Sequence, residues 1–548
     1  MKKLKIYFLL SICSISCIVS AMHSFDDIFD IFDTPEAMEF LSEDSIEGIL
    51  QHHRNVSPET IMQQLVDAGI IPLLEEDLYC HTNPFNQRSL LDFPLFELLH
   101  CDYKGRWVTG FDFFYNQMSD SFYTDHSDRL SSYLNFASES FIDKIQNSVT
   151  PLIDAFSDED YNIDIAKILC IAANLKTHQR RTGFMIHGMR QWKKWRLRFL
   201  FPLYYLERNL FLTDAERDAI AEEFGFDTEQ EDEEFQDAHF ISDKLGFGDT
   251  RLEIERKVFT DKRARVRAGI QLTIPTAFAL KKGLKGSSFA RFKNACLPAP
   301  TLIEDIFCDI LDPAGPQIQK AFDELTAFAL GALDRLSANL LDTSLGNGGH
   351  VGIGAILRIN SDLNKTIHLP WAENVHVCHR GSIEYLFPKD EKIFYVEKNN
   401  AAAFEDRDFT NDAQAAANLA FLEQELVKRF YPVAVDTTVQ PGIIWRWLSR
   451  LDYLGAHAGA NFGFDFWLQT ENKLISMDTP CFGDMTLHLD KDRAKIGYAC
   501  QGQFFGGING KIEQATRIWF LGIQADGTLF SRGIGHDWTV TFNVEVNF

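Results

Sequence analysis

The last twelve residues of the chain, 537–548, alternate strictly between apolar and polar side chains. The apolar phase is formed by Trp538, Val540, Phe542, Val544, Val546 and Phe548, and polar residues occupy the other phase. Successive side chains of a β-strand point to opposite faces of its sheet. The pattern therefore predicts a strand with one apolar and one polar face.

The same period-two pattern recurs in earlier parts of the chain. With the last one included, the predicted strands are 106–117, 182–191, 195–206, 250–259, 264–275, 350–360, 374–387, 442–453, 456–470, 493–504, 515–524 and 537–548. Their lengths are close to the roughly 9–11 residues of a tilted transmembrane strand. After the N-terminal apolar run, no stretch approaches the ~20 apolar residues of a membrane-spanning helix. We therefore expect an all-β, transmembrane, antiparallel β-barrel of about 12 strands.

The connections between these strands alternate between long and short. The long connections are 118–181, 207–249, 276–349, 388–441, 471–492 and 525–536, and the short ones are 192–194, 260–263, 361–373, 454–455 and 505–514. A bacterial barrel with both termini in the periplasm has short turns at that end and long loops outside. A soluble sandwich has no reason to separate its loops by length, so the alternation favours the barrel.

The charges in segment 264–275 indicate which face meets lipid. Val266, Ile270 and Leu272 share one phase, and Arg265 and Arg267 share the other. An arginine on the lipid face costs roughly 2–4 kcal/mol at the membrane midplane. The arginine phase is therefore predicted to face the lumen.

One residue conflicts with this assignment. His379 falls on the lipid phase in the middle of its predicted strand. A β-bulge near Gly381, or a different register, would return it to the lumen.

The N-terminus carries an export signal. Lys2, Lys3 and Lys5 precede a mostly apolar stretch, and small residues before Met22 offer a cleavage site. We therefore predict a signal peptide over residues 1–21.

Taken together, the signal, the alternating strands, the loop pattern and the terminal phenylalanine resemble the outer-membrane β-barrel proteins of Gram-negative bacteria, a porin-like class. The resemblance implies the bacterial outer membrane as the location, and outer-membrane lipid and lipopolysaccharide as surroundings. In that class the last strand is the assembly signal that the barrel assembly machinery reads. The positions that would carry this signal are Trp538, Phe542, Val544, Val546 and Phe548.

The expected domains follow from these patterns. Residues 22–105 show helical spacing and are predicted to form a helical periplasmic segment or a plug that enters the barrel. Residues 106–548 form the barrel and its long extracellular loops, one of which contains a helix at 317–341. The count rises to 14 strands if 391–397 and 432–439 pair as another hairpin.

The predicted lumen contains more bases than acids. The residues expected to line a pore are Arg196, Arg198, Glu253, Glu255, Arg263, Arg265, Arg267, Arg358, Arg446 and Arg450. The same phase also holds the bases Arg251 and Arg380 and the acids Asp112, Glu384, Asp452, Asp465 and Glu545. Positive walls in a narrow channel lower the barrier for anions. The sequence thus predicts a channel for passive passage of small polar, anionic solutes, with the alternative that the arginines form ion pairs that fill a closed interior.

Two other functions remain open. A structural or adhesive surface barrel needs no open pore, and an outer-membrane hydrolase would assemble its site from separate strands. The histidines are scattered and no GxSxG motif occurs, so the sequence favours a non-enzymatic protein and indicates no catalytic residue. It also indicates no metal site and no cofactor.

The overall charge limits the classes of partner that the protein is expected to bind. A net charge of −25 argues against nucleic acid. The acidic stretch 214–237 is a candidate for divalent cations that bridge lipopolysaccharide phosphates. The chain is expected to be either a monomer or a homo-oligomer.

The cysteines fit an oxidising compartment. Disulfides are predicted between Cys80 and Cys101 and between Cys296 and Cys308, while Cys378 and Cys500 are expected to form none.

Overall fold

The structure of this protein is a computed structural model. It describes residues 87–94, 107–119, 176–211, 241–261, 264–284, 341, 343–363, 374–396, 433–477, 481–482, 485–486, 488–513 and 517–547. The predicted signal peptide, the acidic stretch 214–237, nearly all of the helix 317–341 and both predicted disulfides lie outside these residues.

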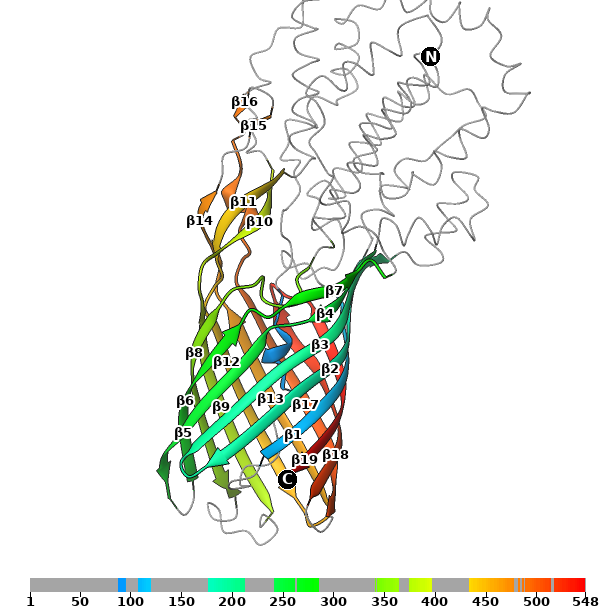
Figure 1. The fold of residues 1–548 in the computed structure, drawn as a ribbon, viewed down its shortest axis with the longest axis vertical. Coiled ribbons are helices and arrows are strands. Elements are labelled where there is room, and N and C mark those ends of the chain that lie inside the picture. The colour runs from blue at the N-terminus through cyan, green and yellow to red at the C-terminus, as the bar shows by residue number, and fades with distance from the viewer. Residues whose placement is uncertain are drawn as a thin grey trace, which may run out of the picture.

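Twelve antiparallel strands form a closed barrel (Figure 1). They are β1 (Trp107–Ser119), β2 (Lys176–Trp192), β3 (Trp195–Phe211), β5 (Thr250–Thr260), β6 (Ala264–Ile274), β8 (Gly352–Asp362), β9 (Val375–Leu386), β12 (Ile444–Leu454), β13 (Ala458–Gln469), β17 (Ala499–Glu513), β18 (Ile518–Arg532) and β19 (His536–Asn547). Consecutive strands pair, and β1 closes the barrel by pairing with β19, with Val108 opposite Asn547. The predicted twelve-strand barrel is confirmed.

Burial alternates along the strands as the sequence predicts. In β6, Ile270 is 60% exposed on the outer surface, whereas Arg267 and Gln271 are buried. In β13, Phe462 is 60% exposed and Asp465 is buried. The barrel therefore has an apolar outer surface and a polar, charged interior, which is the arrangement that a hydrocarbon environment requires.

His379 needs no bulge. The pairing of β9 with β8 and with β12 runs through Gly381 without a register shift. The imidazole stays on the outer phase, where its Nδ1 lies 2.9 Å from Ser449 Oγ and its ring stacks on Trp447 at 5.9 Å. A neighbouring hydroxyl and indole thus accommodate the polar ring, and the predicted bulge is wrong.

Two predicted connections near the C-terminus are also wrong. Strand β17 continues through Gly506, Gly507 and Gly510 to Glu513, and β18 continues through Asp526 to Arg532. The glycines and Asp526-Gly527 indicate turns by composition. However, their backbone pairs continuously with the neighbouring strands, the glycines with β13 and β18 and Asp526 with β17 and β19. The connection between β18 and β19 is a tight turn of residues 533–535, where Gly533 has φ +69°.

Two strands extend the barrel wall at the end opposite the C-terminus. β4 (Ile241–Phe247) precedes β5 and pairs with β3, and β7 (Phe278–Lys282) follows β6 and pairs with β4. The breaks between these strands fall at residues 248–249 and 275–277, and β7 pairs with β4 and not with β8 (Figure 1).

The hairpin predicted from 391–397 and 432–439 forms, but it adds no strands to the barrel. β10 (Lys389–Tyr395) and β11 (Val433–Gln440) do pair, but they join β14 (Lys473–Met477) in a separate three-stranded sheet beyond the barrel end (Figure 1). The connection between β13 and β17, which contains β14, also contains a short hairpin of β15 (Cys481–Phe482) and β16 (Met485–Thr486) and the helix α18 (Lys491–Ala494). Cys378 and Cys500 form no disulfide.

Within residues 87–94, the 3-10 helix η1 (Leu90–Asp92) lies inside the barrel (Figure 1). The Ser89 hydroxyl caps it by accepting a hydrogen bond from Leu91 N. The other helices predicted for residues 22–105 and for the outer loops fall on residues that the structure does not describe. In the described part of the chain, no helix has the length and apolar character to cross a membrane.

Candidate functional site

The barrel interior holds the predicted pore residues. Arg196, Arg198, Glu253, Glu255, Arg267, Arg358, Arg446 and Arg450 are all at least 95% buried there. Arg265 is half-buried near the end of β6, and Arg263 lies outside the described residues. Such burial means that ion pairs and other side chains cover these groups, and their partners decide what the interior can do.

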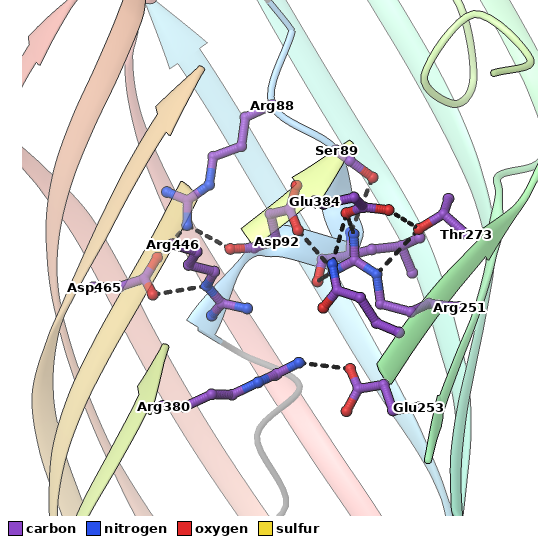
Figure 2. A network of polar contacts seen from close by, with 12 residues as sticks. Arg88, Ser89, Asp92, Arg251, Glu253, Thr273, Arg380, Glu384, Arg446 and Asp465 are labelled. Atoms are coloured by element: carbon purple, nitrogen blue, oxygen red, sulfur yellow. Dashed lines mark hydrogen bonds and ion pairs between the residues drawn. The ribbon is translucent and has the colours of Figure 1, made fainter. Parts of the chain in front are cut away.

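Two glutamates of β5 connect several strands. Glu253 accepts from Arg380 of β9 at 2.6 Å and lies 3.5 Å from Arg198 of β3 (Figure 2). Glu255 likewise lies 3.2 Å from Arg358 of β8 and 3.6 Å from Arg196 of β3. Each carboxylate thus pairs with a direct neighbour strand and with a more distant one.

The pair of Glu255 with Arg358 depends on a small residue in the strand between them. Gly269 of β6 stands beside Glu255, and a Cβ built on it would lie 3.0 Å from Glu255 Cγ and 2.8 Å from Glu255 Cα. Its missing side chain leaves space for Glu255 to reach Arg358. The sequence phase placed these charges in the lumen, but it did not show that the pairs would pass over β6.

Arg446 and Arg450 of β12 have acidic partners of their own. Arg446 Nε donates to Asp465 of β13 at 2.8 Å, and Arg450 lies 2.8 Å from Asp452 on its own strand. Five arginines of the predicted pore, Arg196, Arg198, Arg358, Arg446 and Arg450, therefore take part in buried ion pairs, and Arg267 donates to Gln191 at 2.9 Å. These contacts hold the wall rigid.

The segment 87–94 contributes two charges that the strand pattern missed. Arg88 forms a short ion pair with Asp465, and its Nη1 donates to Gln501 at 2.9 Å and to Gln503 at 2.7 Å (Figure 2). Arg181 of β2 donates to the Arg88 carbonyl at 3.0 Å. Since Arg88 lies outside every alternating segment, only its position among apolar residues hinted that it is buried.

The second charge is Asp92, which binds the opposite wall. Arg251 Nη1 of β5 donates to Asp92 Oδ1 at 2.7 Å and to the Leu91 carbonyl at 2.9 Å (Figure 2). Burial alone raises the pKa of the Asp92 carboxyl. The positive charges of Arg251, Arg446 and Arg88 outweigh that effect, so the pKa lies below its ordinary value of 3.8.

Arg251 is held in place by two further groups, one of which is itself held by Gln271. Its Nη2 donates to Glu384 at 2.9 Å, and its Nε lies 3.4 Å from Thr273 Oγ1. Glu384 also accepts from Gln271 at 2.8 Å. The guanidinium is thereby oriented with one nitrogen pointing to η1.

The remaining surface of η1 is apolar. Leu90, Leu91 and Phe93 pack in one buried cluster with Phe114, Met185, Leu200, Tyr204, Leu206 and Leu345. The segment before β8 covers this cluster, since Tyr204 Oη donates to the Leu345 carbonyl and the Gln87 amide donates to the Ser344 carbonyl at 2.8 Å. The 3-10 helix is thus fixed by charge on two sides and by apolar contact on the others.

Buried charges are divided unevenly around the interior. On β3, β5, β6, β8, β9 and β12, which are contiguous, the inward-facing buried bases are Arg196, Arg198, Arg208, Arg251, Arg267, Arg358, Arg380, Arg446 and Arg450, and the acids are Glu253, Glu255, Glu384 and Asp452. On the other six strands the base is Arg181, and the acids are Asp112, Asp465, Asp526, Asp537 and Glu545. One half of the wall is therefore basic and the other acidic. The segment 87–94, which contains η1, directs Arg88 to the acidic half and Asp92 to the basic half.

The acidic half contains one imidazole. His187 Nδ1 lies 3.0 Å from Asp112 Oδ2, its Nε2 lies 3.6 Å from Glu545 Oε1, and Asn543 donates to Asp112. Both ring nitrogens thus face carboxylates, which is a buried polar network without a nucleophile in these contacts. Within the described residues, no group of three or more His, Cys, Asp or Glu side chains is arranged to hold a metal ion.

No protein-family model matches the sequence, and no curated protein matches it. Among solved structures, an outer-membrane channel from Pseudomonas putida F1 is similar, with 9% identity and a TM-score of 0.38 over 82% of this chain and 100% of that chain. The NanC porin has 7% identity and a TM-score of 0.25 over 68% and 93%. The Pseudomonas putida toluene transporter TodX has 8% identity and a TM-score of 0.29 over 87% and 96%.

The barrel is established by its own strand pairing. Twelve strands close without a free edge, the outer surface is apolar, and tryptophans such as Trp192, Trp195 and Trp538 are exposed near strand ends. A closed barrel leaves no backbone group unpaired in hydrocarbon. The protein is therefore a transmembrane β-barrel.

Proposed function

We propose that the protein is an outer-membrane channel for passive passage of small polar, anionic solutes, and that η1 closes it. The observation that carries this proposal is the charge division of the interior. Nine buried arginines and four carboxylates face the lumen from six contiguous strands. Over the whole interior acids and bases nearly balance, so the excess of bases that favours anions is local to this half.

The position of η1 supports a gated channel over a permanently open one. Arg88, just before η1, contacts Asp465, and Asp92 at the end of η1 contacts Arg251. These two contacts connect the acidic and basic halves across the lumen (Figure 2). Solutes can pass along the basic half only after these contacts are broken. We therefore expect low conductance from the native chain and higher conductance when η1 is released.

Single-channel conductance of the purified full chain in a planar bilayer tests this proposal. The informative variant is Arg88→Gln with Asp92→Asn, which removes both ion pairs of η1. The matched control is Lys389→Gln with Asp390→Asn, which removes one base and one acid from the exposed start of β10. The first variant should open more often than the native chain, with a reversal potential that indicates anions under a salt gradient, and the control should not.

A structural or adhesive barrel is the second candidate, and the burial of the interior charges favours it. Silence from the native chain and from the η1 variant, with barrel insertion verified by gel migration, would contradict the channel and support this alternative. Cation selectivity in the opened variant would contradict the anionic part alone.

Assembly partners belong to the same proposal. Outward-facing Trp538 and Phe542 of β19 are exposed, and Val544 and Val546 share their phase. We propose that these residues and Phe548, which lies outside the described residues, form the signal read by the barrel assembly machinery. Deletion of Phe548 should reduce outer-membrane insertion in cells while leaving refolding in vesicles unchanged; equal insertion would contradict the signal.

Contact with lipopolysaccharide and self-association into homo-oligomers are further proposals. Co-purification with lipopolysaccharide tests the first, and mass measurement in detergent tests the second.

A further inference from the structure

The site that η1 fills has the chemistry of a ligand site. A plug that only blocked the lumen would need bulk, whereas η1 presents a carboxylate to an oriented guanidinium. Arg251 Nη1 binds both Asp92 Oδ1 and the Leu91 carbonyl, while Glu384 and Thr273 hold the other nitrogens. A guanidinium fixed in this way is suited to a carboxylate, because its N–H groups match carboxylate geometry.

An aromatic ring lies beside that carboxylate. Phe93 packs into the apolar cluster of η1, and the guanidinium carbons of Arg88 and Arg181 lie 4.8 Å and 5.9 Å from its ring centroid. Cations over a ring face attract it electrostatically. Arg88 belongs to the segment 87–94 itself, whereas Arg181 is on β2. The wall therefore offers one cation and an apolar surface to a ring next to an anion-binding guanidinium.

The wall partners come from distant parts of the chain. Phe114 is on β1, Met185 is on β2, and Leu200, Tyr204 and Leu206 are on β3. In the interior of a channel for polar solutes, an apolar patch on three strands is unexpected, because water would contact it whenever η1 leaves. An occupant with a matching apolar surface removes that penalty.

We propose that the wall site now filled by η1 binds a solute monocarboxylate with an apolar, ring-bearing body, and that η1 is its intramolecular competitor. This inference rests on the proposed function and names the class of anion that the channel takes. Asp92 occupies the place of the solute carboxylate, and Phe93 with Leu90 and Leu91 occupies the place of its apolar body. The solute opens the channel by replacing η1 at Arg251.

Competition sets the apparent affinity. A ligand that binds only the η1-free form has its affinity reduced by the fraction of chains in that form. Asp92→Asn keeps the size of the side chain but removes its charge, so it weakens the competitor and leaves the wall unchanged. Arg251→Gln removes the guanidinium that both would use.

The test is calorimetric titration of the full chain in lipid nanodiscs with three probes. 3-Phenylpropionate has both a ring and a carboxylate, propionate lacks the ring, and 3-phenylpropanol lacks the carboxylate. We expect saturable binding of 3-phenylpropionate. 3-Phenylpropanol should bind roughly tenfold or more weaker, the size of one charge-assisted hydrogen bond. Propionate should also bind roughly tenfold or more weaker, because it buries no ring. Asp92→Asn should tighten binding of 3-phenylpropionate by roughly tenfold, and the exposed control Asp390→Asn should not.

The variants at Arg251 complete the test. Arg251→Gln combined with Asp92→Asn should lose the gained affinity, and Arg251→Lys with Asp92→Asn should keep part of it, since lysine retains the charge without the fork. Heat-modified gel migration verifies the barrel in each variant. Equal binding of the three probes, or unchanged affinity in Asp92→Asn, overturns the inference. Binding is measured without current, so the two failures can be distinguished. No saturable binding of 3-phenylpropionate contradicts this inference, whereas binding without any conductance contradicts the channel itself.

Discussion

Arg88 and Asp92 lie four residues apart on one short segment and bind opposite walls of the barrel. Arg88 pairs with Asp465 on β13, and Asp92 pairs with Arg251 on β5, at 2.7 Å. The segment is therefore oriented by the division of charge in the wall: a reversed orientation would place each charge against its own sign. This relationship makes the interior sensitive to single charges, and the following predictions test that sensitivity.

Asp465→Asn should destabilise the barrel strongly. The carboxylate is shared by Arg88 and Arg446, so its loss removes one buried ion pair from each of these guanidinium groups. Breaking a buried pair in this way costs about 3–5 kcal/mol. The free energy of unfolding from urea titration in lipid vesicles measures the effect. Asp390→Asn at the exposed start of β10 is the control and should show no measurable change. A similar result for both variants would mean that the Asp465 pairs do not contribute.

Acid should release η1. Because the pKa of Asp92 lies below 3.8 in the folded protein, its ionised form contributes stability at neutral pH, and that contribution is lost as pH falls through the folded pKa. Channel opening of the native chain should therefore increase below about pH 4.

Asp92→Asn isolates this contribution from other acids. The variant lacks the titrating group, so its opening should be higher at neutral pH and should change less on acidification. The measurement is open probability in a planar bilayer between pH 7 and pH 3. Parallel pH curves for the two proteins would assign the acid response to other carboxylates.

Gly269→Ala should disturb the ion pairs of β5. The added Cβ would lie 2.3 Å from the Ile254 carbonyl oxygen and 2.8 Å from Glu255 Cα, so the strands must shift. We expect a loss of about 1–3 kcal/mol in unfolding free energy, typical of overpacking. Gly527→Ala is the matched control, since nothing lies within 4 Å of the position that its methyl group would take, and it should be nearly neutral. Equal losses would show that Gly269 provides no needed space.

Arginine on the outer surface should reveal depth in the membrane. Ile270 is exposed in the middle of β6, and Ile512 is exposed next to the end of β17. Ile270→Arg should cost about 2–4 kcal/mol and Ile512→Arg about 0–1, because lipid-facing arginine is most unfavourable at the midplane. Urea titrations in vesicles compare the two. A larger cost at Ile512 would place the membrane differently along the barrel.

Local pattern determined the strands because burial on one face has a period of two. The alternation of Ile270 with Arg267 and Gln271, or of Phe462 with Asp465, depends only on which face of the wall meets lipid and which faces the lumen. The alternation also put His379 on the outer phase, where it lies, and the bulge or register change proposed to return it to the lumen was wrong. The sequence was less informative where glycine is frequent, since Gly506 and Gly507 fit a turn or a strand equally well without their neighbours.

Charge partners were decided only by the tertiary structure. The pair of Glu255 with Arg358 crosses β6 because Gly269 leaves space, and that geometry depends on the curvature of the closed wall. The excess of bases read from individual strands is likewise balanced by acids such as Asp526, which lay in a predicted loop.

The sequence by itself determined the barrel, its twelve strands and the face of each that meets lipid, because these follow from the alternation of neighbouring side chains. Only the tertiary structure placed Arg88 and Asp92 inside the lumen and against opposite walls. No local pattern specifies such contacts, since they join residues as far apart as Arg88 and Asp465 and depend on the charges that all the other strands bring to the interior.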